Sequence, residues 1–328
     1  MLQNMKLNLE IIGVAIVFGL MGCNSAPVDP INIPTNTNKN QPQVVATTDI
    51  LCDLTQEIAQ NTIDLTCLIN PGTDPHLYQP KPEDRQAIEN AKLILYAGYD
   101  FEPGLIKLIQ ATKNPASKIA VNEVAVPNPE PFQENGKTIP DPHVWHDAKN
   151  GIRIVETIRS NLEKLAPSNA VLYNSNAEKI TSELRQVDTW IKTQVATIPP
   201  TQRKLVTTHD ALGYYVKAYG LSFEGALGGL STEEKPTAAR VKALVKDIKN
   251  VGVPTIFAET TTNPRLIEAV AKEANVKVSD RELFADSLGA LGTEGDNYQG
   301  MLIANTRTIV EGLGGKYTPL KAKNYNQP

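Results

Sequence analysis

The sequence predicts an α/β fold in which two similar lobes are joined by one long backbone helix, with a cleft between them. Strand-like and helix-like segments alternate from residue 44 to about residue 112, and again from residue 204 to about residue 278. Such alternation is typical of parallel sheets covered by helices. Between the two sets, apolar residues recur every three to five positions from Leu172 to Val195, and Pro199-Pro200 follows. A helix over this stretch is about 40 Å long at 1.5 Å per residue, enough to run along both lobes.

The first set predicts an N-terminal lobe over residues 44–168. Short apolar runs alternate there with segments of helical spacing. The predicted strands are 44–48, 64–70 and 93–96, and the predicted helices are 50–60, 82–90 and 102–112. Ligands of open parallel sheets gather at the carboxyl ends of the strands. His76 comes after the second predicted strand.

The second set predicts a C-terminal lobe over residues 199–328, with the linking helix at 169–198. The predicted strands are 205–208, 255–258 and 276–278, and the predicted helices are 212–219, 238–250 and 264–274. His209 follows directly on the first of these strands.

The first 22 residues are predicted to be an export signal. Lys6 precedes an apolar run from Ile11 to Leu20, which is too short for a convincing membrane-spanning helix. The run ends in Leu20-Met21-Gly22-Cys23, which resembles a bacterial lipobox, and we expect Cys23 to carry a lipid that anchors the chain to a membrane surface. An ordinary signal peptide with an incidental cysteine is the alternative. Residues 23–43 lack an apolar pattern and are predicted to be a flexible tether.

The other two cysteines, Cys52 and Cys67, form one possible pair. An exported chain lies in an oxidising compartment, so a disulfide between the first helix and the following strand is expected. A thiol metal site is the competing interpretation, and it lacks nearby matched histidines. The net charge is −4 with both signs interspersed and no basic run, which predicts no nucleic-acid binding.

Three of the four histidines lie in short motifs far apart in the chain: Asp74-Pro75-His76, Asp141-Pro142-His143 and Thr208-His209-Asp210. Proline restricts the residue before it to extended backbone, so His76 and His143 are presented at fixed bends. A lone histidine is more often a core or surface residue than a ligand. Two Asp-Pro-His motifs in a histidine-poor chain nevertheless predict a metal site, because imidazole is the commonest transition-metal ligand.

Four stretches of the chain, in this order, resemble the signatures of the zinc/manganese solute-binding proteins of bacterial ABC importers. They are Asp-Pro-His-Leu-Tyr-Gln-Pro at 74–80, Asp-Pro-His-Val-Trp at 141–145, Thr-His-Asp-Ala-Leu-Gly-Tyr-Tyr at 208–215 and Ala-Asp-Ser-Leu-Gly at 285–289. The resemblance extends from Val44 to about Lys316. It implies two α/β lobes joined by a rigid helix, with one divalent transition metal held in the cleft.

The resemblance implies that His76 and His143 of the N-terminal lobe and His209 and Asp286 of the C-terminal lobe are the metal ligands. Asp286 is implied by the resemblance alone, because other acidic residues are near it in sequence. His146 departs from the family, which usually has an apolar or small residue there. It either assists metal capture or is a surface or helix-start hydrogen-bonding residue.

The resemblance further implies a monomeric, lipid-anchored receptor on the periplasmic or cell-surface side of the plasma membrane. Such a receptor passes its metal to a membrane permease and is not an enzyme. With two ligands from each lobe, the metal is expected to bridge the lobes, and the long helix to limit their movement. Glu259 and Asp210 are candidates to accept hydrogen bonds from the ligating imidazoles.

Three imidazoles and one carboxylate suit tetrahedral Zn²⁺, whereas Mn²⁺ gains from additional carboxylate oxygens. Manganese-selective members of the family often have Glu where this chain has His209, which favours zinc. Zinc members often carry a histidine-rich loop before the second ligand motif, however, and residues 127–140 contain no histidine. We therefore expect Zn²⁺ first and Mn²⁺ next.

Three alternative functions fit parts of the sequence. A zinc hydrolase needs an open coordination position for water, which four protein ligands would fill, and the chain has no His-Glu-x-x-His segment. The glycine-rich stretch 225–230 lacks the lysine of a phosphate-binding loop, which disfavours nucleotide binding. A lipid-anchored metal buffer or adhesin stays open.

Overall fold

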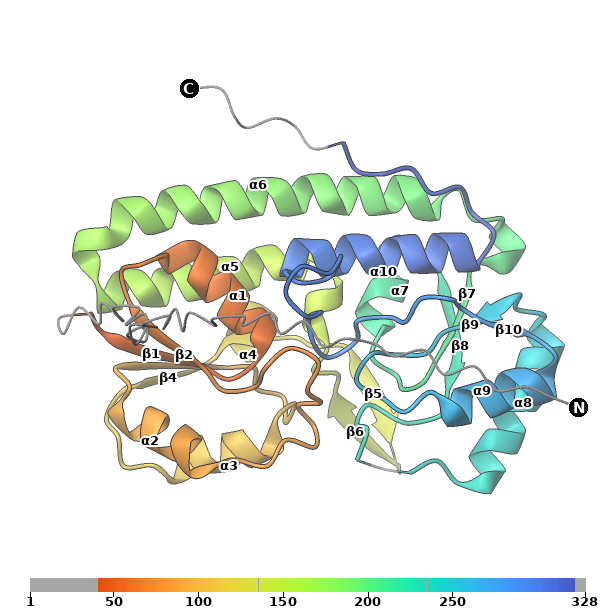
Figure 1. Ribbon diagram of the computed structural model, residues 1–328, viewed down its shortest axis with the longest axis horizontal. Coiled ribbons are helices and arrows are strands. Elements are labelled where there is room, and N and C mark those ends of the chain that lie inside the picture. The colour runs from red at the N-terminus through yellow and green to blue at the C-terminus, as the bar shows by residue number, and fades with distance from the viewer. Residues whose placement is uncertain (1–40, 135, 234, 322–328) are drawn as a thin grey trace, which may run out of the picture. The chain divides into compact units, whose positions relative to one another are not determined.

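The computed structural model describes residues 41–134, 136–233 and 235–321. The predicted export signal, Cys23 and the tether up to residue 40 lie outside these ranges. Within them, parallel strands form two lobes that one long helix joins (Figure 1), so the predicted fold class is confirmed. In the described residues, no helix has both the length and the apolar character needed to cross a membrane.

The N-terminal lobe contains a four-stranded parallel sheet with the order β2-β1-β3-β4. Its strands are β1 (Gln43–Ala46), β2 (Asp64–Cys67), β3 (Leu93–Tyr96) and β4 (Ser117–Ala120). The helices between them are α1 (Asp49–Ala59), α2 (Pro82–Asn90) and α3 (Pro103–Ala111). Predicted and observed bounds differ by at most about three residues, and β4 was not predicted.

Alternate side chains of the central strands point to opposite faces of this sheet. Val44 and Ala46 of β1 belong to the core that includes α1, while Val45 packs with the apolar side chains of α2 and α3. Both faces are therefore covered, which explains why the central strands β1 and β3 read as nearly continuous apolar runs. Cys52 of α1 is bonded to Cys67 of β2, as predicted, and the bond joins a helix to the edge of the sheet.

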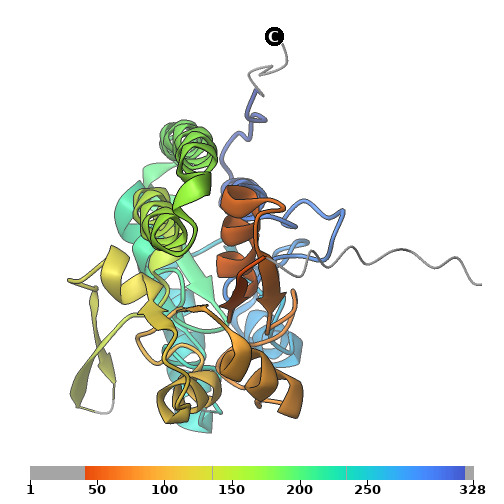
Figure 2. The ribbon, with the colours of Figure 1, turned by 90° about the vertical axis from the view of Figure 1, so that its left-hand side faces the viewer.

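Along the chain, several elements that were not predicted come between β4 and the long helix. They are α4 (Val121–Ala125), the antiparallel hairpin of β5 (Pro131–Glu134) and β6 (Lys137–Pro140), the 3₁₀ turn η1 (Val144–His146), and α5 (Ala148–Leu165). The hairpin projects to one side in Figure 2. Ile154, Ile158 and Leu162 of α5 are buried at a spacing of four residues, a helical pattern that the sequence does contain.

The long helix α6 spans Ala170–Val195 and has 26 residues, which corresponds to about 39 Å. The 3₁₀ turns η2 (Pro167–Asn169) and η3 (Pro200–Gln202) flank it. It packs on α5, on α1 and on α10 (Tyr298–Gly312), and Figure 1 shows it extending over both lobes. The prediction of a linking helix is confirmed, whereas the lobe boundaries 44–168 and 199–328 remain predictions.

The C-terminal lobe repeats the arrangement of the first. It contains two parallel pairs, β7 (Lys204–Thr207) with β8 (Ser222–Ala226) and β9 (Thr255–Ile256) with β10 (Lys277–Val278). The helices of this lobe are α7 (Gly213–Tyr219), α8 (Ala238–Val251), α9 (Arg265–Ala274) and the unpredicted α10. Phe257 N donates to Val206 O at 3.0 Å, so the pairs are neighbours in the order β8-β7-β9-β10. This order matches β2-β1-β3-β4.

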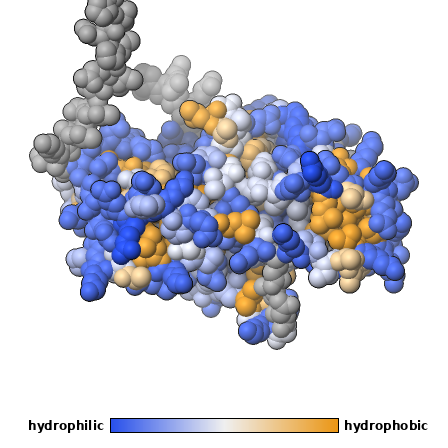
Figure 3. All heavy atoms as spheres, turned by 60° about the horizontal axis from the view of Figure 1, so that its bottom comes forward, coloured by the Kyte–Doolittle hydropathy of each residue, from blue (hydrophilic) through white to orange (hydrophobic). Residues whose placement is uncertain are grey.

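One apolar core passes beneath α6 and includes side chains from both lobes, among them Leu54 of α1, Leu184 of α6 and Ile309 of α10. Burial of this shared core opposes a large separation of the lobes, because opening would expose apolar surface to water. The face shown in Figure 3 is largely hydrophilic, and its apolar residues form separate groups.

Candidate metal centre

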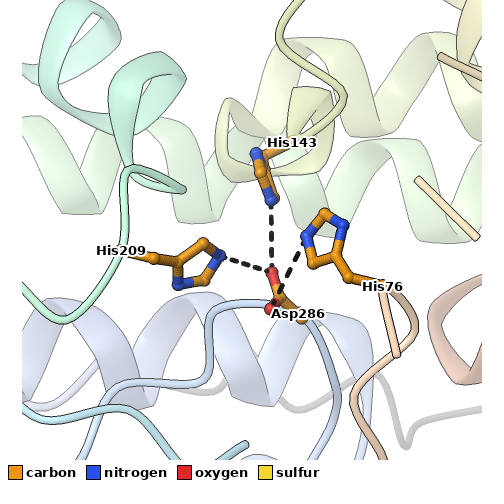
Figure 4. Close-up of side chains that lie close together, drawn as sticks. All are labelled: His76, His143, His209 and Asp286. Atoms are coloured by element: carbon orange, nitrogen blue, oxygen red, sulfur yellow. Dashed lines mark ion pairs between the residues drawn. The ribbon is translucent and has the colours of Figure 1, made fainter. Parts of the chain in front are cut away.

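The four residues singled out from the sequence come together in one place (Figure 4). His76 lies in the loop after β2, His143 directly before η1, His209 after β7, and Asp286 in the segment after β10. Each residue is at most 6 % exposed. One donor atom from each residue lies within 4.8 Å of all the others, although the chain separates the first residue from the last by more than 200 positions.

The distances between donor atoms fit a small cation. Asp286 Oδ1 lies 3.3 Å from His143 Nε2 and 3.3 Å from His209 Nε2, and Asp286 Oδ2 lies 4.0 Å from His76 Nε2. A tetrahedral site with bonds of about 2.0–2.1 Å has donor–donor edges of about 3.3–3.4 Å. Two of the three edges match this value, and the third is longer.

Within the described part of the chain, the donor atoms have no hydrogen-bond partner. His76 Nε2, His143 Nε2, His209 Nε2 and both carboxylate oxygens of Asp286 are buried, and none of them makes a hydrogen bond to a described residue. Most buried polar atoms in proteins are hydrogen-bonded, because an unpaired one costs about 1–3 kcal/mol. Five unpaired atoms that converge on one point, three of them imidazole nitrogens and two carboxylate oxygens, therefore fit a transition-metal site.

The carboxylate of Glu259 sets the tautomer of His209. Its Oε2 lies 2.5 Å from His209 Nδ1, and its Oε1 accepts from the backbone N–H groups of Thr208 and His209, each at 3.0 Å. Because a carboxylate only accepts, Nδ1 carries the proton and the Nε2 lone pair is left for a metal. The prediction for Glu259 is thus confirmed, whereas Asp210 makes no hydrogen bond to an imidazole among the described contacts.

Asp141 does the same for His143, a role that the sequence reasoning missed. Its Oδ1 lies 2.8 Å from His143 Nδ1 and accepts from His143 N at 2.9 Å. In the other Asp-Pro-His motif, Asp74 Oδ1 accepts from His76 N at 3.0 Å. The aspartate of each motif thus closes a turn around the proline, which is the local reason for the repeated motif. The repetition itself was the available signal.

His146 is not a surface residue, contrary to one of the two interpretations. It is fully buried, and its Nε2 lies 2.8 Å from the carbonyl oxygen of Ala285. A carbonyl only accepts, so Nε2 is protonated and cannot bind a metal at the same time. His146 is also outside the group of four converging donors. It is a hydrogen-bonding residue, but its partner belongs to the segment of Asp286.

The metal-free site holds opposite charges. Burial lowers the pKa of His143, but Asp141 and Asp286 outweigh burial and raise it to about 8. Burial also opposes the charge of His209, whose pKa is nevertheless held well above the usual value by Asp286 and Glu259. Burial alone dominates at His76 and lowers its pKa to about 3. Although burial raises the pKa of Asp286, the charge of His209 and the adjacent polar group of His143 hold it well below its usual range.

These pKa shifts favour the exchange of protons for a cation. The pKa of His143 is raised to about 8 and that of His209 is held well above its usual value, so a metal ion that binds their Nε2 atoms must displace protons from them. Four protein donors also fill a tetrahedral coordination sphere. The arrangement is therefore suited to holding a metal ion.

Comparison with known proteins agrees with this geometry. Residues 44–312 match the family model of the periplasmic zinc-uptake complex component A, ZnuA. The manganese ABC transporter substrate-binding lipoprotein PsaA of Streptococcus mitis is 34 % identical over 278 residues, covering 83 % of this chain and 89 % of the relative. The metal ABC transporter substrate-binding lipoprotein FimA of Streptococcus parasanguinis is 32 % identical, covering 92 % of this chain and 96 % of the relative.

Solved structures share the fold. The periplasmic zinc-binding protein TroA of Treponema pallidum superimposes with a TM-score of 0.79 at 32 % identity, over 83 % of this chain and 99 % of TroA. A manganese-bound variant of the periplasmic metal-binding protein of Candidatus Liberibacter asiaticus gives a TM-score of 0.75 at 28 % identity, over 83 % of this chain and all of that chain. Their names include both zinc and manganese.

Proposed function

This chain belongs to the family of the periplasmic zinc-uptake complex component A, and from that premise we propose that it captures one divalent transition metal outside the cytoplasm and delivers it to the permease of an ABC importer. The observation that carries the proposal is the convergence of five buried, unpaired donor atoms from His76, His143, His209 and Asp286. Relatives named as substrate-binding lipoproteins of metal ABC transporters support the delivery step.

We propose Zn²⁺ as the preferred metal and Mn²⁺ as the next. Three neutral nitrogens and one carboxylate suit the small tetrahedral Zn²⁺ ion. The distances from Asp286 Oδ1 to His143 Nε2 and to His209 Nε2, 3.3 Å each, fit the donor–donor separation of such a site. Mn²⁺ prefers more oxygen ligands and is the weakest binder of the divalent series at such a site. The name of PsaA includes manganese and that of TroA includes zinc, so the relatives do not favour either metal. The preference for Zn²⁺ therefore rests on the set of donor atoms.

We propose that the chain acts as a carrier and not as an enzyme. Its four protein donors leave no place in a tetrahedral sphere for the water molecule that a hydrolytic zinc site activates. The mature chain is expected to be monomeric and tethered through a lipid on Cys23 to the extracytoplasmic face of the membrane. The lipoprotein relatives support this location.

The metal is expected to bridge two lobes, residues 44–168 and 199–328, which the helix at 169–198 links covalently. Because α6 and the shared core beneath it contact both lobes, loading requires only a modest movement of loops and of one lobe. Release follows when the permease draws the ligands apart or when His143 and His209 regain their protons at low pH.

Native mass spectrometry of the chelator-stripped protein, residues 24–328, tests this function. Zinc and manganese are offered in equimolar amounts. We expect one bound zinc ion, which Asp286→Asn abolishes and Asp296→Asn, a matched change in a nearby acidic loop, leaves in place. One bound manganese ion would reverse the proposed metal preference. Absence of any stoichiometric metal in the unmodified protein would overturn the function.

A further inference from the structure

The segment that carries Asp286 leaves the C-terminal sheet just before this residue. Leu283 N still donates to Ala258 O at 2.9 Å, next to β9. Asn305 of α10 then holds Phe284, accepting from its N–H and donating to its carbonyl, each at 2.8 Å. From Ala285 to Leu288, the segment is hydrogen-bonded to residues of the N-terminal half of the chain.

On one side of Asp286, the carbonyl oxygen of Ala285 accepts two hydrogen bonds. Trp145 Nε1 donates at 3.2 Å and His146 Nε2 donates at 2.8 Å. Both donors are buried and belong to η1, the turn that begins directly after His143. The same short turn therefore presents one ligand and holds the backbone beside another.

On the other side, Asp49 at the start of α1 holds the next two residues. The hydroxyl of Ser287 donates to Asp49 Oδ2, and Leu288 N donates to the same oxygen at 2.8 Å. Gly72 N, in the loop that leads to His76, donates to Ser287 Oγ at 2.6 Å. Asp49 is only 4 % exposed, so these bonds lie out of contact with bulk water.

We propose that Asp49, Trp145 and His146 are positioning residues that clamp the segment 285–288 and thereby fix the Asp286 carboxylate against His143 and His76. The inference rests on the proposed function and adds to it groups that do not touch the metal. The attachments at Ala285 and Ser287 are each one residue from Asp286, and consecutive Cα atoms are only about 3.8 Å apart. The carboxylate therefore has little freedom to move away from the two histidines of the N-terminal lobe while the clamp is closed.

Partners that orient metal ligands affect affinity strongly, and their loss typically costs about 10–100-fold. His146 offers a test that separates its hydrogen bond from its volume. His146→Leu removes the donor and keeps a similar size, whereas the amide nitrogen of His146→Gln replaces the Nε2 donor. Asp49→Asn weakens the other attachment, because the carboxylate uses one oxygen for Ser287 and Leu288 and the other for Ile50 N, whereas an amide offers only one oxygen. Tyr173→Phe is the control, since it removes a half-buried 2.8 Å hydrogen bond to Thr62 that lies outside the clamp.

The measurements are the Zn²⁺ dissociation constant by chelator competition and the visible spectrum of the Co²⁺-loaded protein, which reports ligand geometry. We expect His146→Leu and Asp49→Asn to weaken Zn²⁺ binding by about 10–100-fold and to change the Co²⁺ spectrum. His146→Gln and Tyr173→Phe should stay within about threefold of the unmodified protein, a margin well below the typical loss.

The outcomes are distinguishable. If the unmodified protein binds zinc and His146→Leu and Asp49→Asn bind it equally well with an unchanged Co²⁺ spectrum, the clamp is refuted and the function stands. An equal loss of Zn²⁺ affinity in His146→Gln and His146→Leu would also refute the clamp, because side-chain volume would then be the cause. A comparable loss in Tyr173→Phe would refute it as well, because general stability would then be the cause. If His146→Leu does not fold, Asp49→Asn and His146→Gln still decide. Failure of the unmodified protein to bind any metal would refute the function instead.

Discussion

Glu259→Gln is the substitution whose effect on metal binding follows most directly from the structure. The buried carboxylate accepts three hydrogen bonds, from His209 Nδ1 and from the backbone N–H groups of Thr208 and His209. A glutamine offers one oxygen in place of two. If that oxygen keeps the two backbone bonds, the amide N–H₂ faces the ring and favours the tautomer in which His209 Nδ1 accepts.

That tautomer carries its proton on Nε2, the atom that would bind the cation. Metal binding therefore requires the proton to move to Nδ1. The Nδ1–H group of His209 then faces the amide N–H₂ group of the glutamine, so that two buried donors oppose each other. An unsatisfied buried group costs about 1–3 kcal/mol, which corresponds to a factor of about 5–150 in the dissociation constant. The usual loss for such partners, about 10–100-fold, falls within this range. We therefore expect Zn²⁺ binding to weaken by about 10–100-fold.

Competition with a chromophoric chelator at pH 7 measures this change. Asp210→Asn is the matched control, since it removes a neighbouring carboxylate that makes no hydrogen bond to an imidazole among the described contacts, and it should have the smaller effect. Thermal unfolding of both metal-free variants reports whether the fold is intact. A Glu259→Gln protein that binds Zn²⁺ within twofold of the unmodified protein would refute the tautomer argument.

Three further outcomes are expected. Zn²⁺ binding at pH 7 should release roughly two protons, one from His143, whose pKa is about 8, and one from His209, whose pKa is held well above its usual value. The affinity then rises as the pH rises through 8. Calorimetry in buffers of different ionisation enthalpy measures the release, and a value near zero would contradict this expectation. In the metal-free protein, the charge of His143 stabilises the fold fully below pH 6.5, and this contribution is lost as the pH rises through about 8. Urea unfolding across that range should therefore show a falling free energy of unfolding. Replacing Cys52 and Cys67 by alanine opens a link between residues 15 positions apart and should lower the free energy of unfolding by about 3 kcal/mol without changing Zn²⁺ affinity; an unchanged urea midpoint would contradict it.

The alternation of short strands and helices was readable from the sequence because both patterns are local. Residues 82–90 and 93–96 were predicted with the bounds that the structure has, and the linking helix was predicted to within about three residues at each end. The helix α5 also has a readable pattern of buried positions. Its buried positions recur every four residues, so a local signal for this helix is present in the sequence.

Some elements carry weaker local signals. The strand β4 reads Ser-Lys-Ile-Ala and has no fully buried residue, so neither alternation nor a continuous apolar run marks it. It is recognisable as a strand because it pairs in parallel with β3. The pairing of β9 and β10, two residues each, likewise depends on neighbours that the sequence does not specify locally.

For the site, the sequence by itself identified three histidines, because Asp-Pro-His motifs and a strand-end histidine are short-range features. Asp286 depended on family resemblance, since nothing local distinguishes it from Asp280 or Asp296. Only the tertiary structure decided that Asp286 meets the imidazoles, that Asp141 and Glu259 set two of the tautomers, and that His146 bonds a carbonyl 139 positions away. Hydrogen bonds act over about 3 Å in space and leave no periodic trace along the chain, so contacts between distant segments appear only when the fold brings those segments together.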